Sequence, residues 1–205
     1  MNSSMKKLCK GSIQDALEPS EIVIVKEIIN RTKEICKKET GKSPAFLLIG
    51  MRALYFYFGR AAFSPALFSV EIDLNFDILG EWAPYRHKIP NLLKRTLEPL
   101  GYHVNPGIGL ISILKERLLI HLTVIFEHKP QIIGEFIPEL QIHAGDKYFL
   151  IYSKLSRGDP VRDLKYLFQL CKKQIDVNKI LSFAYESELK IIKDRINSLG
   201  ERSVD

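Results

Sequence analysis

Residues 68–79, FSVEIDLNFDIL, alternate strictly between apolar and polar side chains. Successive side chains of a β-strand point to opposite faces of a sheet, so a period of two predicts a strand. One face of this strand is entirely apolar, while the other carries the carboxylates of Glu71, Asp73 and Asp77. The chain is therefore expected to contain a sheet with one buried face. The acidic face either meets only water or holds a metal ion.

The composition is that of an ordinary globular protein. Of the 205 residues, 46% are hydrophobic and 26% are charged, which argues against a disordered chain. The formal net charge of +6 is compatible with a polyanionic partner, although charge alone does not identify one.

No segment has the pattern of a secretion signal or a membrane anchor. The first residues, MNSSMKKLCKGS, are basic but lack an apolar run, and the most apolar stretch, AFLLIGMRALYFYFG, is short and includes Arg52. Cys9, Cys36 and Cys171 lie far apart, which argues against a zinc site or a disulfide framework. These features predict a cytoplasmic protein that does not bind a membrane.

Three regions are expected along the chain. Residues 1–20 are polar and aperiodic, which predicts a flexible N-terminal arm. Residues 21–143 mix strand and helix patterns and form the expected core, whereas residues 144–205 have helical patterns throughout. Short links between the strands expected over 101–126 favour antiparallel neighbours. The predicted fold class is therefore α/β (α+β), a mixed sheet flanked by helices, with a C-terminal helical region.

A glycine separates a short buried strand over 45–49 from a helix over 51–59. A glycine turn before a helix offers free backbone N–H groups and the positive end of the helix dipole, which favours a phosphate at Gly50. The acidic strand follows about twenty residues later, and Glu71 and Asp73 would point the same way from it. Two such carboxylates can hold Mg²⁺ through oxygen ligands.

This order of segments resembles a known family. IGMRALYFYFG followed by FSVEIDLNF is similar to the glycine motif and the S/T-x-D-x-D motif of polymerase-beta-type nucleotidyltransferases, and within them of the AbiEii-type toxins of type IV toxin–antitoxin systems. SKLSRGDPVRDLKYL is similar to the lysine and the R-D-L-x-D-L helix that these toxins carry later. The matching positions are Gly50, Ala53, Leu54, Ser69, Ile72, Asp73, Leu74, Lys154, Arg162, Asp163 and Leu164.

The resemblance implies a nucleotidyltransferase-like core that transfers a nucleoside monophosphate from an NTP to an RNA or protein acceptor, in a toxin-like setting with an antitoxin-like partner. Glu71 and Asp73 would be catalytic and would hold Mg²⁺ or Mn²⁺. Asp163, also catalytic, would orient Lys154 or the acceptor. The residues expected to bind the nucleotide are Gly50, Met51, Arg52, Ser69 and Lys154.

The chain departs from the family pattern at several positions. Met51 and Arg52 replace the second glycine and the small hydroxyl residue, and Glu71 replaces the first aspartate of the metal pair. Such enzymes usually take a third carboxylate from a later strand, where this chain offers only His121 and Thr123. Imidazole is a poor ligand for Mg²⁺, which prefers oxygen.

These departures leave alternatives open. The first is a catalytically degenerate protein that keeps the fold as a nucleotide- or partner-binding module. The second is a basic nucleic-acid-binding protein without nucleotide chemistry, which only the net charge supports. Arg52 either faces solvent or reaches a phosphate.

Overall fold

The protein is described by a computed structural model covering two compact units. The sheet unit consists of the described residues within 17–52 and 69–145, and the helical unit of those within 1–16, 53–68 and 146–205. Helix α4 (Gly50–Phe58) begins in the sheet unit and continues into the helical unit. The residues that the structure describes are 10–64, 71–77, 82–85, 87–125, 128–157 and 161–200.

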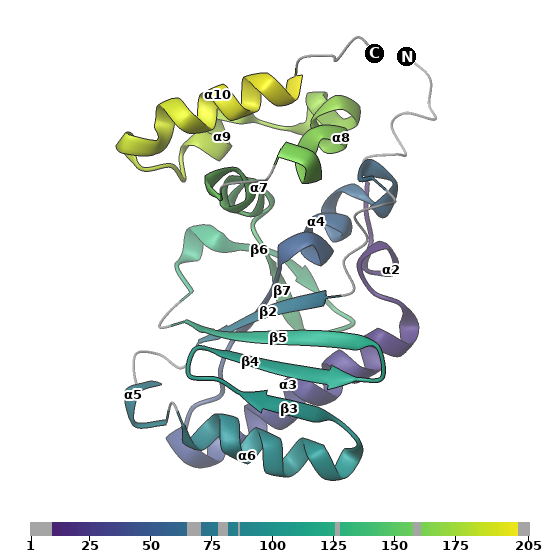
Figure 1. The fold of residues 1–205 in the computed structure, drawn as a ribbon, viewed down its shortest axis with the longest axis vertical. Coiled ribbons are helices and arrows are strands. Elements are labelled where there is room, and N and C mark those ends of the chain that lie inside the picture. The colour runs from purple at the N-terminus through teal and green to yellow at the C-terminus, as the bar shows by residue number, and fades with distance from the viewer. Residues whose placement is uncertain are drawn as a thin grey trace. The chain divides into compact units, whose positions relative to one another are not determined.

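The described part of the sheet unit contains a mixed sheet in the order β3-β4-β5-β2-β1-β7-β6 (Figure 1). Strand β2 lies at its centre, antiparallel to β1 and parallel to β5, while β3, β4 and β5 form an antiparallel meander. The mixed sheet predicted from the short links is confirmed. The strands are β1 (Phe46–Ile49), β2 (Glu71–Asp77), β3 (His103–Pro106), β4 (Leu110–Lys115), β5 (Leu118–Ile125), β6 (Ile133–Ile137) and β7 (Ile142–Gly145).

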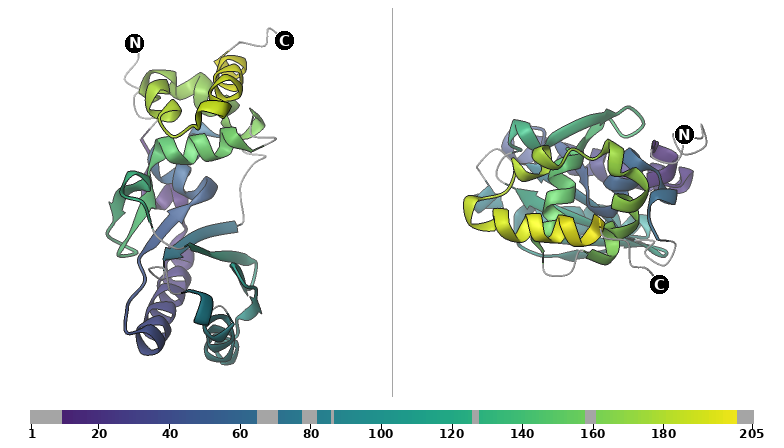
Figure 2. Two further views of the ribbon diagram at one scale, coloured as in Figure 1. Left: turned by 90° about the vertical axis from the view of Figure 1, so that its left-hand side faces the viewer. Right: turned by 90° about the horizontal axis from the view of Figure 1, so that it is seen from above.

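The apolar face predicted for the acidic strand is buried. Ile72, Leu74 and Phe76 of β2 are fully buried, and the residues that share this face on β4 and β5 are buried with them. Helix α3 (Pro19–Thr40) lies behind the strands in Figure 1 and packs on α6 (Lys88–Leu97), which contacts β3. The left view of Figure 2 shows these two helices next to each other below the strands. Because this face of β2 is buried and side chains alternate along a strand, the carboxylates of β2 lie on its opposite face.

Helix α3 has clear start and stop signals. Glu18 and Glu21 form a capping box, in which the backbone N–H of Glu18 donates to Oε2 of Glu21 at 2.8 Å. The helix ends at Gly41, whose φ of 75° suits glycine, and the amide of Gly41 donates to the Lys37 carbonyl.

Two parts of the sheet unit differ from the prediction. Strands β6 and β7 lie where no strand is expected, because residues 127–144 are interrupted by prolines and Gly134 and show no sustained alternation. The flexible arm expected over 1–20 does not extend to residue 20, since α3 already begins at Pro19. Before it, the short helix α2 (Ile13–Ala16), in the helical unit, buries Ile13 and Ala16.

The helical unit is built from the segments with helical patterns at the C-terminal end of the chain. Helix α7 packs against α8, α9 and α10, and α10 also packs on α8. Phe183 lies edge-on to Phe149, and Tyr152 donates a hydrogen bond to Glu188 at 2.8 Å. The elements are α7 (Lys147–Ser156), α8 (Val161–Cys171), α9 (Val177–Leu181), α10 (Leu189–Gly200) and the 3-10 turns Arg60–Ala62, Lys172–Gln174 and Glu186–Glu188.

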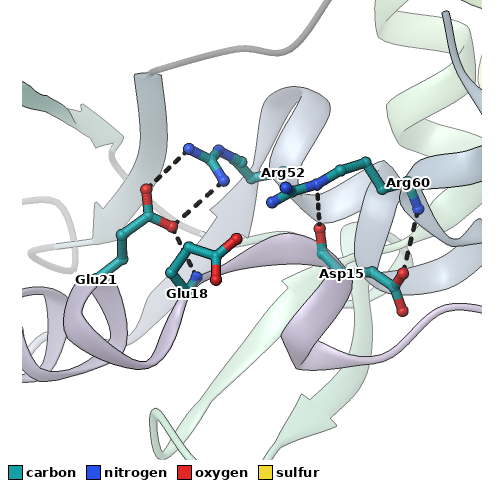
Figure 3. A network of polar contacts seen from close by, with 5 residues as sticks. All are labelled: Asp15, Glu18, Glu21, Arg52 and Arg60. Carbon is teal, nitrogen blue, oxygen red and sulfur yellow. Dashed lines mark hydrogen bonds and ion pairs between the residues drawn. The ribbon is translucent and has the colours of Figure 1, made fainter. Parts of the chain in front are cut away.

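Arg60 ties two segments of the helical unit together. Its Nε donates to the backbone oxygen of Asp15 at 3.2 Å, and its backbone N–H donates to Oδ1 of the same residue at 3.4 Å (Figure 3). Residues 45 positions apart are joined in this way, which fastens α2 beside the turn that follows α4.

The sequence argues against a disulfide framework, and one cysteine differs from this expectation. Cys171 is disulfide-bonded, whereas Cys36 is a free and fully buried thiol. Spacing in the sequence carries no signal for this bond, because disulfide pairing depends on contacts in the folded chain. Within the described residues, no helix has the length and apolar character needed to cross a membrane.

Candidate functional site

The register of the sheet brings a histidine beside the acidic strand. On β2, Asp73 is flanked by Ile49 of β1 and by His121 of β5, each directly opposite it. Adjacent strands lie about 4.8 Å apart, so side chains paired in this way on one face are in reach of each other. His121 therefore lies beside Asp73 on the strand expected to supply a third ligand.

Glu71, Asp73 and His121 form a cluster, here named the metal triad. One ligand atom of each residue lies within 4.8 Å of the corresponding atoms of the other two. The Nδ1 atom of His121 is 3.3 Å from Oδ1 of Asp73. Glu71 is exposed and the other two are half-buried, so the cluster can be reached from solvent. Two carboxylates and an imidazole are a donor set that binds divalent metal ions in proteins.

Gly50 is the residue that lets a helix begin beside this cluster. Its φ of 71° lies in the left-handed region, and a Cβ at this position would stand closer than 3.0 Å to Oδ2 of Asp73. The backbone at the start of α4 is thus packed directly against the Asp73 carboxylate. A helix N-terminus favours anionic groups, so a turn that could hold a phosphate and a carboxylate that could hold a cation lie at one place.

The two residues after Gly50 have buried side chains. Met51 is 7% exposed, so only its backbone N–H is suited to meet a phosphate. Arg52 is 6% exposed and donates to both carboxylate oxygens of Glu21, at 3.0 and 3.3 Å (Figure 3). A phosphate would have to compete with this bidentate pair for the guanidinium. Arg52 links the start of α4 to the first turn of α3 within the sheet unit.

Asp77, the third carboxylate of the alternating strand, is a structural residue. It is 5% exposed, and its Oδ1 accepts a hydrogen bond from the Ala45 N–H at 3.1 Å. Its Oδ2 lies 3.1 Å from Nδ1 of the buried His128. Burial lowers the pKa of His128, although the Asp77 charge opposes this shift. The acidic face of β2 is thus divided between a solvent-accessible metal triad and a buried structural pair.

The remaining predicted site residues lie in the helical unit or outside the described residues. Lys154 lies on α7 and Asp163 on α8, both in the helical unit, and the side chain of Asp163 is outside the described part of the structure. Ser69 also lies outside the described residues. Their roles in nucleotide binding therefore stay predictions.

A cavity that the sequence does not predict opens at the same end of the sheet as the triad. Its volume is about 610 Å³, and it lies between the first turn of α3 and the turn that joins β4 to β5. Leu118, at its edge, precedes the residue that pairs with Glu71. The only sequence signal for it is the charged turn Lys115–Arg117 between two strands. Its lining consists of Ser20, Glu21, Val23, Ile24, Arg52, Lys115, Glu116, Arg117 and Leu118.

Comparison with known proteins gives a likeness at the level of structure. No family model and no curated protein matches the chain. A solved structure of the antibiotic-resistance factor ANT(2'')-Ia resembles it with a TM-score of 0.47 and 12% sequence identity, covering 89% of this chain and 96% of that one. At this identity and score, the activity has to be argued from the residues of this chain.

Proposed function

We propose that the chain is a nucleotidyltransferase that transfers a nucleoside monophosphate from an NTP to a hydroxyl acceptor. The observation that carries the proposal is the packing of Gly50 against Asp73, which brings a helix start and a carboxylate cluster together. Transfer of a nucleotide needs a cradle for the triphosphate and a cation that neutralises its charge. The resemblance of the motif order to polymerase-beta-type nucleotidyltransferases supports the same conclusion.

In this proposal the metal-binding and phosphate-binding residues have separate roles. Glu71 and Asp73 hold a divalent cation, which when bound neutralises phosphate charge and favours the deprotonated acceptor hydroxyl. The backbone N–H groups that follow Gly50 bind the phosphates, and Ser69 and Lys154 add contacts by analogy with the family. The acceptor oxygen attacks the α-phosphorus, pyrophosphate leaves, and the hydroxyl proton is released to solvent.

Arg52 has a supporting role in this proposal. Its bidentate pair with Glu21 holds the first turn of α4 to α3, and so positions the helix start beside Asp73. Asp163 orients Lys154 or the acceptor, as the family resemblance implies. The acceptor is an RNA or protein hydroxyl, and a toxin-like setting with an antitoxin-like partner follows from the resemblance alone.

Labelling by NTP carrying a radioactive α-phosphate tests the proposal. The wild-type chain is expected to transfer label to RNA or protein in the presence of Mg²⁺ or Mn²⁺, and Asp73→Asn and Glu71→Gln should abolish transfer. Glu34→Gln, which removes an exposed carboxylate of α3, is the matched control and should leave transfer unchanged. Equal labelling by wild type and Asp73→Asn would contradict the proposal.

A second candidate is the catalytically degenerate module, which His121 at the third-ligand position favours. It predicts metal-dependent NTP binding that Asp73→Asn weakens, without transfer to any acceptor. Equilibrium binding of each NTP, measured with and without divalent metal, separates it from a nucleic-acid-binding protein that has no affinity for NTP.

A further inference from the structure

The feature that goes furthest beyond the family pattern is the imidazole at the edge of the carboxylate pair. His121 faces Asp73 across neighbouring parallel strands, and Ser112 faces His121 from the other side. His121 is therefore held in the middle of the sheet by backbone pairing on both sides. Its side chain shares a face with Glu71 and Asp73 as a consequence of the pleat.

The spacing within the metal triad suits ligands of one ion. Ligand atoms at about 2.1 Å from a metal lie about 3.0–3.4 Å apart when they are neighbours in an octahedron or a tetrahedron. The His121 Nδ1 and Asp73 Oδ1 atoms are 3.3 Å apart, within this range. A charge-assisted hydrogen bond between them would be shorter, about 2.7–2.9 Å. The same two atoms are within hydrogen-bonding distance of each other, so a cation bound by both would replace this contact.

Asp73 presents its two oxygens to different neighbours. Oδ1 is directed to His121, whereas Oδ2 lies against the backbone of Gly50 at the start of α4. This contact limits how Asp73 can turn away from His121. A cation between Oδ1 and Nδ1 would then receive one oxygen from Asp73, one oxygen from Glu71 and one nitrogen from His121.

We propose that His121 is a metal ligand and that the triad selects a first-row transition-metal dication, such as Mn²⁺ or Co²⁺, over Mg²⁺. Mg²⁺ demands an octahedral set of oxygens, so replacing one oxygen by an imidazole nitrogen disfavours it. Imidazole suits the later first-row metals, whose affinity for nitrogen sites rises along the series from Mn²⁺. The inference rests on the proposed function for its biological role, but not for the binding of metal itself.

The test is metal binding by the whole chain in the absence of NTP. Calorimetry should give wild type at least about a tenfold lower Kd for Mn²⁺ than for Mg²⁺, and Co²⁺ should develop a visible absorption band on binding. His121→Asn keeps the other four histidines and should lose the Co²⁺ band and most of the Mn²⁺ affinity. Thr123→Ala, two residues further along β5 on the same face, is the matched control and should bind as wild type.

His121→Asp provides the complementary variant, because it restores three carboxylates. It should bind Mg²⁺ more tightly than wild type and lose the preference for Mn²⁺. Thermal unfolding without metal identifies any variant that fails to fold, and the gain in Tm on adding metal gives a second measure of binding. Equal affinities of wild type for Mg²⁺ and Mn²⁺, or a Co²⁺ band unchanged in His121→Asn, would overturn the proposal.

The outcomes separate this inference from the proposed function. Selective Mn²⁺ and Co²⁺ binding without nucleotide transfer would support the metal site and refute the transferase. Transfer that is supported by Mg²⁺ as well as by Mn²⁺, and that survives in His121→Asn, would support the transferase and refute the role of His121.

Discussion

Gly50 and Asp73 are packed so closely that position 50 has no room for a side chain. A Cβ there would come closer than 3.0 Å to Oδ2 and to 3.2 Å from Cγ, which is also tighter than ordinary van der Waals contact. Since Gly50 also has a φ of 71°, both the backbone conformation and the carboxylate require glycine. The contact joins the end of β1 to the centre of β2 at the metal triad.

Gly50→Ala should therefore lower stability and disturb the site. The left-handed conformation alone costs about 1–2 kcal/mol for a residue with a Cβ, and the overlap with Asp73 adds to that cost. Urea unfolding measures the first effect, and the Kd for Mn²⁺ measures the second. Because Asp73 must shift to relieve the overlap, weaker metal binding is expected in the folded variant.

Gly41→Ala separates the cost of the left-handed backbone conformation from the effect of the overlap with Asp73. Gly41 has nearly the same φ, 75°, but a Cβ there would meet no atom within 4 Å. The Gly41→Ala variant should be destabilised only by the conformational cost, and it should bind metal as tightly as wild type. If both alanine variants bind metal equally well, Gly50 is not needed to position Asp73.

Burial of Cys36 predicts an unreactive thiol. Burial raises its pKa to about 12, so the thiolate that reacts with alkylating reagents is almost absent near neutral pH. Mass spectrometry after treatment with iodoacetamide should show Cys36 unmodified in the native chain and modified in urea. Glu34→Cys, at an exposed position of the same helix, is the control and should be modified without urea. Rapid native labelling of Cys36 would mean that α3 opens readily.

The sequence predicted the local parts of this fold and left out its long-range pairs. Alternation along β2 was sufficient to predict the strand, its buried face and the common direction of Glu71 and Asp73. Its pairing with β5 is a contact between residues 48 positions apart, so the parity of His121 could be predicted but not its position opposite Asp73. Imidazole chemistry argued against Mg²⁺ without showing that His121 reaches the acids.

Arg52 shows the same limit in another way. Neither of the two alternatives that the sequence left open, solvent or a phosphate, includes Glu21, because that partner lies 31 residues earlier on α3. Asp77 similarly has the pattern of a third site carboxylate, yet its partners are Ala45 and His128, which no local pattern predicts. Strands β6 and β7 were missed because neither shows a sustained period of two.

The pair of His128 and Asp77 predicts that stability falls in mild acid. Burial holds the pKa of His128 below its ordinary value of 6.5, so the unfolded chain binds a proton more readily than the folded chain. Stability is therefore complete above the unfolded pKa and is lost as pH falls through it, until the folded pKa is reached. The free energy of unfolding, measured between about pH 8 and pH 5, should decrease more steeply in wild type than in His128→Gln.

His103→Gln controls for the loss of any histidine, because it removes an exposed one on β3. The comparison also depends on His128→Gln remaining folded at pH 8, which circular dichroism checks. Identical slopes for wild type and His128→Gln would show that burial does not lower the pKa of this histidine.

The buried pair of Arg52 and Glu21 predicts strong coupling between two helices. Their side chains are only 7% and 17% exposed, so Arg52→Met would leave the Glu21 carboxylate without its cation and should cost about 3–5 kcal/mol. Adding Glu21→Gln removes the carboxylate charge that Arg52→Met leaves unpaired. The double variant should therefore lose less free energy of unfolding than the sum of the losses in the two single variants. Arg31→Met breaks an exposed pair with Glu34 and should cost at most about 1 kcal/mol.

The same variants test whether Arg52 positions α4 or contacts the nucleotide. The Arg52 guanidinium loses its charge pair in Glu21→Gln and would attract a phosphate more strongly, so a direct contact predicts tighter NTP binding in that variant. A positioning role predicts the reverse, because the first turn of α4 loses its attachment to α3 and Gly50 is held less firmly beside Asp73. We expect NTP affinity to fall in Glu21→Gln and to be unchanged in Arg31→Met, as measured by equilibrium binding with Mn²⁺ present. Tighter NTP binding in Glu21→Gln would instead assign Arg52 to the triphosphate.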